Sequence, residues 1–267
     1  MAKGDNSSNV VERAIEYWNG DEGKRGIVTL CWHWCPAARY DKSKSDPWGT
    51  FYTDKTKFNL ARAMNGRDPD GYQMLLDDID AIAVQLKRLQ DADVPVLWRP
   101  LHEASGGWFW WGASGADAYL QLYKLMYDRL TNVHGLNNLI WVWNGQDAAW
   151  YPGDEYVDII GEDIYPGKHV YTSQAARFIK ALSYTDTRKL ITLSENGCIP
   201  DPEQLVRDNI MWSYWCVWEG EFVLKAAGFN NYSEQYTEKN MLKKAYKSDT
   251  VITRKELPDL RNYPLGD

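Results

Sequence analysis

The chain has 267 residues, with 30 Lys plus Arg against 37 Asp plus Glu, and its formal net charge of −7 argues against a nucleic-acid binder, which would carry a basic face. Hydrophobic residues make up 44% and charged residues 25%, which argues against wholesale disorder, and no apolar run reaches the roughly 18 residues that a membrane helix needs. The 14 Trp and 17 Tyr are an excess of residues that combine a flat apolar face with a polar group, as a surface for flat, hydroxylated ligands would need.

Apolar runs of strand length alternate with amphipathic helical patterns along the chain. The runs are short, rich in Val, Ile and Trp, and bounded by Gly, Pro or Asp, which is typical of buried parallel strands. Ser114 and Asp117 are predicted to form a capping box for one of the helices. In chain order we predict helix 9–18, strand 27–33, helix 72–91, strand 95–101, helix 116–133, strands 139–144 and 157–164, helix 172–183, strands 190–195 and 211–218, and helix 233–247.

The repeated order of strand, helix and strand predicts an α/β fold with right-handed crossovers. We expect the sheet to close into a barrel, because polar and aromatic residues gather at the ends of the predicted strands, where barrel active sites are built. These residues are His33, His102, Glu103, Tyr165, Glu195 and Trp218. No internal repeat or Pro-rich linker interrupts the sequence, so we predict a single domain that spans residues 1–267.

Four cysteines, Cys31, Cys35, Cys198 and Cys216, form no CxxC pair and have no paired histidine spacing. We therefore expect small buried hydrophobic residues rather than a zinc site. No other metal site is predicted.

The most informative segment runs from Val96 to Gly112, where Glu103 follows a strand and precedes a glycine-rich aromatic loop. A carboxylic acid that protonates a leaving oxygen needs a raised pKa, and apolar rings raise it by desolvation. Trp108, Trp110 and Trp111 can supply such rings. The alternative is that the glutamate is capped or ion-paired and that the indoles belong to the core.

Glu195 ends a later strand, in the segment Leu190-Ile-Thr-Leu-Ser-Glu-Asn-Gly197. Two carboxyl groups at the carboxyl ends of two barrel strands can face each other across a sugar ring, which is the minimum apparatus of glycoside hydrolysis. When the two groups are about 5 to 5.5 Å apart, the second carboxylate attacks the sugar directly and the configuration is retained. With 37 acidic residues, however, accidental pairs are common, so the pair alone is a moderate signal.

Five segments together resemble the strand-end motifs of glycoside hydrolase family 26, in the family's order between Gly26 and about Pro258. They are Cys31-Trp-His-Trp34, Trp98-Arg-Pro-Leu-His-Glu103, the Gly-Trp-Phe-Trp-Trp-Gly run that ends at Gly112, Gly161-Glu-Asp-Ile-Tyr165 and Leu193-Ser-Glu-Asn-Gly197.

The resemblance implies a role for several residues. Glu103 is expected to be the acid/base and Glu195 the nucleophile, with the Tyr165 hydroxyl holding the nucleophile in place. The expected sugar contacts are His33, His102, Trp108 and Trp218, with Trp215 as a competing assignment for Trp218; His33 could instead be a buried strand histidine. Arg99 is expected to be a partner of the carboxylates in the barrel interior, and His134 and His169, which match no motif, are expected on the surface.

The resemblance also implies an α/β fold of the (β/α)8 TIM barrel type. The six predicted strands then correspond to strands 3 to 8, so the chain is expected to lack strands 1 and 2. Open strand edges invite association, so a monomer or an edge-mediated dimer is expected. The residues 39–70, with Trp48, Phe51 and Tyr52, would either form a wall of the cleft or cover the barrel.

The activity that the resemblance implies is a retaining endo-β-1,4-mannanase that acts on β-mannan, glucomannan and galactomannan and requires no metal or organic cofactor. Two alternatives stay open: a β-1,3-1,4-glucanase or β-1,3-xylanase on the same scaffold, and an inactive carbohydrate-binding barrel fragment. No nucleic acid or membrane partner is expected. A polymeric substrate cannot enter a cell, so we expect an extracellular, secreted protein whose signal peptide is absent from this chain.

Overall fold

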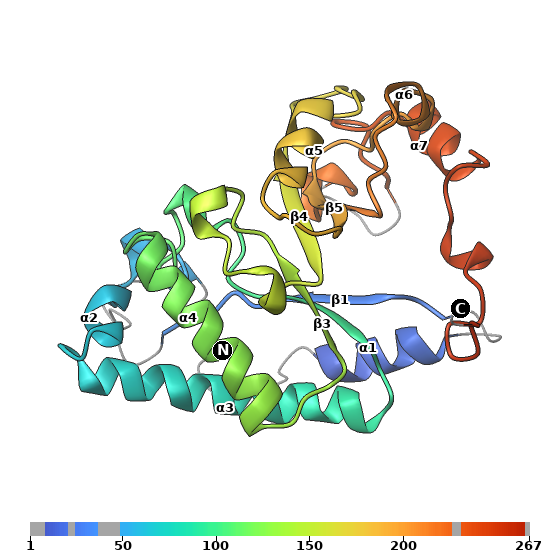
Figure 1. Cartoon of the computed structure of the whole chain (residues 1–267). Coiled ribbons are helices and arrows are strands. Elements are labelled where there is room, and N and C mark those ends of the chain that lie inside the picture. Colours follow the sequence, from blue (N-terminus) through green and yellow to red (C-terminus); the bar gives the residue numbers. More distant parts are fainter. Residues whose placement is uncertain (1–8, 21–24, 37–48, 226–230, 265–267) are drawn as a thin grey trace. The chain divides into compact units, whose positions relative to one another are not determined.

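The computed structural model describes residues 9–20, 25–36, 49–225 and 231–264 (Figure 1). The chain divides into two compact units, Met1–Asp158 and Ile159–Asp267. Each unit contains three parallel strands with helices packed against them, which confirms the α/β class. None of the helices in the described ranges is long and apolar enough to cross a membrane.

The first unit is built on strands β1 (Val28–Cys31), β2 (Val96–Arg99) and β3 (Leu139–Trp143). They pair in parallel in the order β1-β2-β3, so the carboxyl ends of all three meet at one edge. The helices are α1 (Val10–Asn19), α2 (Leu60–Met64), α3 (Pro69–Asp91) and α4 (Ala116–Asp128), and α4 continues into a π-helical turn, Arg129–Val133.

Both the capping residues and the apolar spacing in the sequence specify helix α3, the long cyan helix in Figure 1. Asp68 caps its start by accepting a hydrogen bond from the Gly71 N–H at 3.0 Å, and Pro69 follows in the first turn. A stripe of Leu75, Ile79, Leu86 and Leu89 is buried. The regular spacing of this stripe explains why the helix is predicted so closely from the sequence.

The second unit is built on β4 (Ile159–Ile164), β5 (Leu190–Asn196) and β6 (Trp215–Val217), with helices α5 (Ala175–Leu182), α6 (Pro202–Asp208) and α7 (Lys239–Tyr246). A β-bulge interrupts the pairing of β4 with β5: Glu162 lies opposite Leu193 and Asp163 opposite Glu195, so Ser194 is the extra residue. The Ser194 hydroxyl donates to Asp163 Oδ1 at 2.6 Å and fixes the bulge.

Helix α5 is tied to the back of β4 by the carboxylate of Glu162. This side chain is fully buried, accepts a hydrogen bond from Arg177 Nε at 2.8 Å, and accepts another from the Tyr184 hydroxyl at 3.0 Å. Burial raises the pKa of Glu162, whereas Arg177 opposes the shift. The charge pair thus compensates part of the cost of placing a carboxylate in the core.

All six predicted strands are confirmed, and most are shorter than predicted. Two expectations are wrong in detail. Strand β6 is only half-buried, so Cys216 on it is exposed rather than buried; Cys31 on β1 is half-buried, while Cys35 and Cys198 are buried. The predicted capping box is absent, because α4 begins after Gly115 without a side-chain cap and the Ser114 hydroxyl instead accepts a hydrogen bond from the Ala61 N–H.

Two short helices, α2 and α6, were not predicted, and α7 begins at Lys239 rather than at residue 233. Short 3-10 turns complete the described structure at Thr53–Lys55, Ala104–Gly106, Ala148–Trp150, Asp154–Tyr156, Gly220–Phe222 and Arg254–Glu256.

Candidate active site

In the first unit, Glu103 lies four residues beyond the end of β2, in a backbone conformation that side chains rarely adopt. Leu101 has φ 52° and Glu103 has φ 53°, both in the left-handed region. The Glu103 N–H donates to the Asn144 carbonyl at 2.7 Å, just past the end of β3. The tight turn therefore holds the glutamate at the carboxyl edge of the β1-β2-β3 sheet, and it stores backbone strain there.

The glutamate carboxylate is held by Trp108. The indole Nε1 donates to Glu103 Oε2 at 3.0 Å, and the indole itself is 46% exposed. Gly107, at φ 72°, makes the turn that brings the indole back over the glutamate. Trp108 is thus the one member of its tryptophan run that combines an exposed apolar face with a contact to the carboxylate.

The other two indoles of this run, Trp110 and Trp111, belong to the core. Both are fully buried, and their Nε1 atoms donate to backbone carbonyls, at 2.6 Å to Trp34 and at 2.8 Å to His102. They do not present a free face to a ligand. Trp111 fixes the backbone directly before Glu103, and Trp110 fixes the segment after β1, so both indoles belong to the core as the alternative interpretation predicted.

Two histidines belong to or lie beside the loop between β2 and α4 that contains Glu103 and Trp108, here called the glutamate loop. The rings of His33 and His102 meet edge to face, with centroids 4.9 Å apart. His102 is buried, and burial, together with the charges of Arg99 and His33, holds its pKa well below the usual range. The imidazole is therefore neutral at neutral pH, and its buried Nδ1 has no hydrogen-bond partner among the described residues.

The segment that contains Phe51 and Tyr52 runs along the glutamate loop. Tyr52 forms an antiparallel bridge with Phe109, and the Thr53 N–H donates to the Trp108 carbonyl at 2.8 Å. The Phe51 ring packs edge-on against His33, with centroids 4.8 Å apart. This part of the 39–70 region therefore forms a wall of the glutamate loop, whereas Trp48 lies outside the described residues.

Asn144 is a functional candidate that sequence reasoning missed. It is fully buried; its carbonyl accepts from Glu103, and its Oδ1 accepts from Arg99 Nη1 at 2.9 Å. Arg99 thus supports the glutamate turn through Asn144. The only sequence signal was a polar residue at the end of a buried strand, the same signal that selected His102 and Glu195.

In the second unit, Glu195 is the second-last residue of β5 and is only 5% exposed. The Tyr165 hydroxyl donates to Glu195 Oε2 at 2.7 Å, as the resemblance implies. Tyr165 itself lies one residue beyond the end of β4, and its side chain is 43% exposed. A buried carboxylate with a phenol donor from the neighbouring strand is well suited to act as a fixed nucleophile.

Trp218 lies just beyond β6, where its N–H donates to the Asn196 carbonyl at 3.0 Å. The side chain is half-buried, and so is that of Trp215 within the strand. Both therefore remain candidates for the indole that supports a sugar ring.

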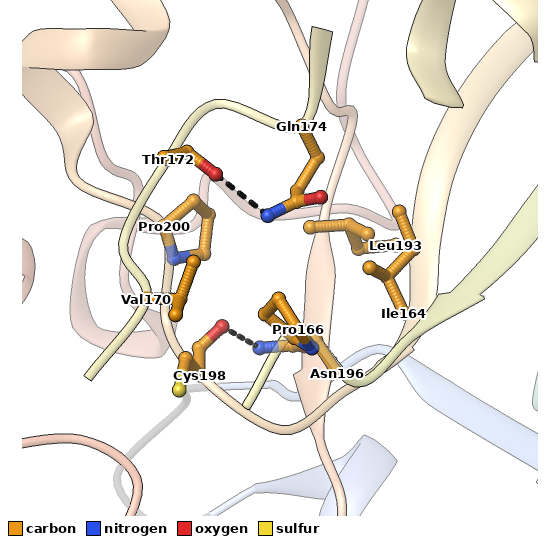
Figure 2. A pocket seen from close by; sticks show the side chains of 9 residues that line it. All are labelled: Ile164, Pro166, Val170, Thr172, Gln174, Leu193, Asn196, Cys198 and Pro200. Carbon is orange, nitrogen blue, oxygen red and sulfur yellow. Dashed lines mark hydrogen bonds between the residues drawn. The ribbon is translucent and has the colours of Figure 1, made fainter. Parts of the chain in front are cut away.

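A cavity too small for a sugar lies between the ends of β4 and β5 and the segments that follow these strands (Figure 2). Its volume is about 10 Å³, roughly what one water molecule requires. Asn196 points into it, is 1% exposed, and donates through Nδ2 to the Cys198 carbonyl at 2.7 Å, so it braces the turn that follows Glu195.

His169 is exposed, as expected, and His134 is half-exposed; both rings also form contacts. His134 Nε2 lies 2.6 Å from Asp80 Oδ1, and the His169 ring contacts the Glu234 carbonyl at 2.8 Å. Arg129 also pairs with Asp80, and its hydrogen bond lowers the pKa of that carboxyl. These histidines lie in structural contacts of exposed or half-exposed segments.

Comparison with known proteins gives a consistent result. The model of glycosyl hydrolase family 26 matches residues 2–256. A mannan endo-1,4-beta-mannosidase of Thermothelomyces thermophilus is 45% identical over 248 residues, which cover 92% of this chain and 48% of that protein. A β-(1,4)-mannanase structure from Podospora anserina is 40% identical with a TM-score of 0.80, over 93% of this chain and 53% of that one.

A β-mannanase from a symbiotic protist of the termite Reticulitermes speratus, solved with a gluco-manno-oligosaccharide, is 36% identical with a TM-score of 0.79. That match covers 95% of this chain and 73% of the other. The chain spans about half the length of the Thermothelomyces relative and of the Podospora structure.

Proposed function

Because this chain belongs to glycosyl hydrolase family 26, we propose that it is a retaining endo-β-1,4-mannanase acting on β-mannan, glucomannan and galactomannan. The observation that carries the proposal is that each predicted glutamate lies at or just beyond the carboxyl end of a parallel strand and accepts a hydrogen bond from an aromatic donor: Glu103 from Trp108, and Glu195 from Tyr165. The relatives described above, a mannan endo-1,4-beta-mannosidase and a β-mannanase, support the choice of substrate.

The mechanism is a double displacement. Glu195 attacks the anomeric carbon, and its carboxylate becomes bonded to the sugar while Glu103 gives a proton to the departing glycosidic oxygen. Glu103 then takes a proton from a water molecule, whose oxygen attacks the same carbon and releases Glu195. The configuration is inverted twice and so retained. No step requires a metal or an organic cofactor.

We assign the sugar contacts to His33, His102, Trp108, Tyr165 and Trp218. Half-exposed indoles provide the flat apolar face that a sugar ring packs on. The neutral His102 can accept a hydrogen bond from a sugar hydroxyl, or donate one to it, without introducing a charge.

We assign the six strands to positions 3 to 8 of a (β/α)8 barrel that forms a single catalytic domain, and the TM-scores of about 0.80 against two mannanases support this. A monomer or an edge-mediated dimer is the proposed state. Because a polysaccharide cannot enter a cell, we propose that the protein acts outside it.

The test is product analysis on galactomannan, glucomannan, mixed-linkage β-glucan and β-1,3-xylan, with Glu195→Ala as the control for contaminating activity. Oligosaccharides from the two mannans alone are the expected result. Products only from the glucan or the xylan would replace the mannan assignment. A folded chain that binds mannan but releases no product would overturn the enzymatic proposal in favour of a carbohydrate-binding role.

A further inference from the structure

The hydrogen bond between Tyr165 and Glu195 depends on the position of the Tyr165 side chain, which β4 alone does not fix. Tyr165 lies beyond β4, and nearly half of its side chain is exposed. Exposed side chains change rotamer rapidly unless something packs against them. Other contacts of the ring must therefore keep its hydroxyl at 2.7 Å from Glu195 Oε2.

Two neighbours limit where the Tyr165 ring can lie. Phe222 packs against it, with ring centroids 5.4 Å apart and planes at 56°. Gly197 lies against the same two rings, since a Cβ there would lie 3.1 Å from Phe222 Cε1 and 3.2 Å from Tyr165 Cδ1. Because these contacts are already tight, a side chain at position 197 would displace one of the rings.

Phe222 is in turn held by Tyr236. Their centroids are 4.2 Å apart, the shortest ring separation in this group. The Tyr236 hydroxyl donates to Glu221 Oε1 at 3.2 Å, and Gln235 Nε2 donates to Glu221 Oε2 at 3.0 Å. The carboxylate next to Phe222 thus fastens its 3-10 turn to residues 235 and 236.

Tyr236 has a fixed backbone position. Its carbonyl accepts hydrogen bonds from the His169 N–H at 3.0 Å and from the Cys198 thiol at 3.1 Å. The same thiol lies 2.9 Å from the Gly167 carbonyl, so it connects the turns after β4 and β5 with residue 236. The turns that carry Tyr165 and follow Glu195 are therefore fastened to the segment that holds Phe222.

We propose that Phe222 and Tyr236 are positioning residues that hold the Tyr165 hydroxyl on Glu195, Phe222 by packing against the Tyr165 ring and Tyr236 by packing against Phe222. The inference rests on the proposed function, because it takes Glu195 as the nucleophile. Phe222 contacts the Tyr165 ring and Tyr236 contacts Phe222, so we assign both an indirect role through Tyr165. A misplacement of about 1 Å in such a site can lower a rate roughly 100-fold.

The kinetic test is a double-mutant cycle of Phe222→Ala and Tyr165→Phe on mannan. We expect Phe222→Ala to lower kcat about 10- to 100-fold with little change in KM. It should cost much less in the Tyr165→Phe background, where the hydroxyl is already absent. Phe222→Tyr, which keeps the ring, should restore most of kcat. A loss of equal size in both backgrounds would overturn the proposal.

The matched control is Phe178→Ala. Phe178 is also half-buried in the second unit and packs on one aromatic partner, Trp212, at 5.0 Å. Its loss should lower the thermal midpoint about as much as Phe222→Ala while leaving kcat unchanged. If Phe178→Ala lowers kcat as Phe222→Ala does, the effect is one of general stability and the proposal is wrong.

A second readout does not depend on mannan hydrolysis. With 3-fluorotyrosine at position 165 of the whole chain, the 19F resonance should be shifted or broadened by Phe222→Ala or Tyr236→Ala and left unchanged by Phe178→Ala. An inactive chain that shows this pattern overturns the proposed function but keeps the packing role of Phe222. An active chain whose resonance ignores Phe222 and Tyr236 overturns only the inference.

Discussion

Glu103 and Glu195 lie near the carboxyl ends of parallel strands in different units, and the backbone presents them in different ways. Glu103 lies in a strained left-handed turn outside its strand, half-buried beside an exposed indole. Glu195 lies inside its strand, buried, directly after the bulge at Ser194. The left-handed turn and the bulge each place a carboxylate where a regular strand would not. Only the turn leaves the side chain within reach of solvent.

The difference fits the two chemical roles. A nucleophile must meet one carbon atom at one angle, so a buried position with a fixed donor is an advantage. An acid/base must first give a proton to a leaving oxygen and then take one from water, so access to solvent is part of its work.

The largest expected effect is on the buried carboxylate. Glu195→Ala removes the group that bonds to the sugar, so kcat on mannan should fall by at least about 10⁴-fold, while mannan binding persists because it rests on the indoles. Initial rates and affinity electrophoresis in mannan gels measure the two effects. Glu203→Ala, which changes an exposed glutamate of the same unit, is the control and should keep full activity. Turnover unchanged in Glu195→Ala would remove the nucleophile assignment.

The half-exposed carboxylate should be less critical, because substrate chemistry can replace it. Glu103→Ala should lower turnover of mannan by about 10²- to 10⁴-fold. Aryl glycosides with good leaving groups should still form the covalent intermediate, and azide should then release it as a glycosyl azide. Steady-state rates with and without azide measure this. If azide rescues nothing on activated substrates, Glu103 is not the acid/base.

A smaller effect is expected from the indole that holds Glu103. Trp108→Phe keeps an aromatic face but removes the donor that lies 3.0 Å from Glu103 Oε2. We expect kcat to fall about tenfold, in keeping with a hydrogen bond to a charged group of roughly 1.5 kcal/mol or more. Trp108→Ala should in addition raise KM, because the apolar face is lost. An unchanged kcat in Trp108→Phe would show that the donor does not matter, and an equal KM for the two variants would show that the apolar face does not.

The last prediction concerns the stability of the first unit and leaves the rate unchanged. Trp34 Nε1 donates to Asp78 Oδ2 at 2.6 Å in the first unit, and burial raises the pKa of Asp78 to about 6. The folded chain therefore binds this proton more tightly than the unfolded chain. Stability contributed by this group is complete below about pH 4 and is lost as pH rises to about 6, by up to roughly 3 kcal/mol.

Asp78→Asn keeps an acceptor for Trp34 and cannot ionise, so it should flatten the stability curve between pH 4 and 6. Urea unfolding across that range measures the change. Asp77→Asn alters an exposed neighbour on the same helix and should leave the slope in place. An unchanged slope in Asp78→Asn would mean that another group titrates in this window.

The elements were predictable because local patterns encode them. The buried runs of β2 and β5 and the regular stripe of α3 depend on residues close together in sequence, so composition and spacing suffice. Glu103 and Glu195 were predictable for a related reason. Each stands at the end of such a run, and parallel strands bring their carboxyl ends to a common edge.

What the sequence could not supply are contacts between distant residues. The Ser114 hydroxyl binds the Ala61 N–H, 53 residues away, instead of capping its own helix. Phe51 reaches His33 and the glutamate loop through backbone pairing with residues 108 to 110. The bulge at Ser194 is likewise invisible in the alternation of the strand, because it depends on the pairing with Asp163.

The left-handed turn at Glu103 also bears on how such a chain can change over generations. A left-handed backbone costs a side chain about 1 to 2 kcal/mol, which glycine avoids. Replacing Glu103 with glycine would thus make the turn easier to form while removing the carboxyl. Selection for folding and selection for activity therefore oppose each other at this residue, and a lineage that no longer needed the activity would gain by losing the glutamate first.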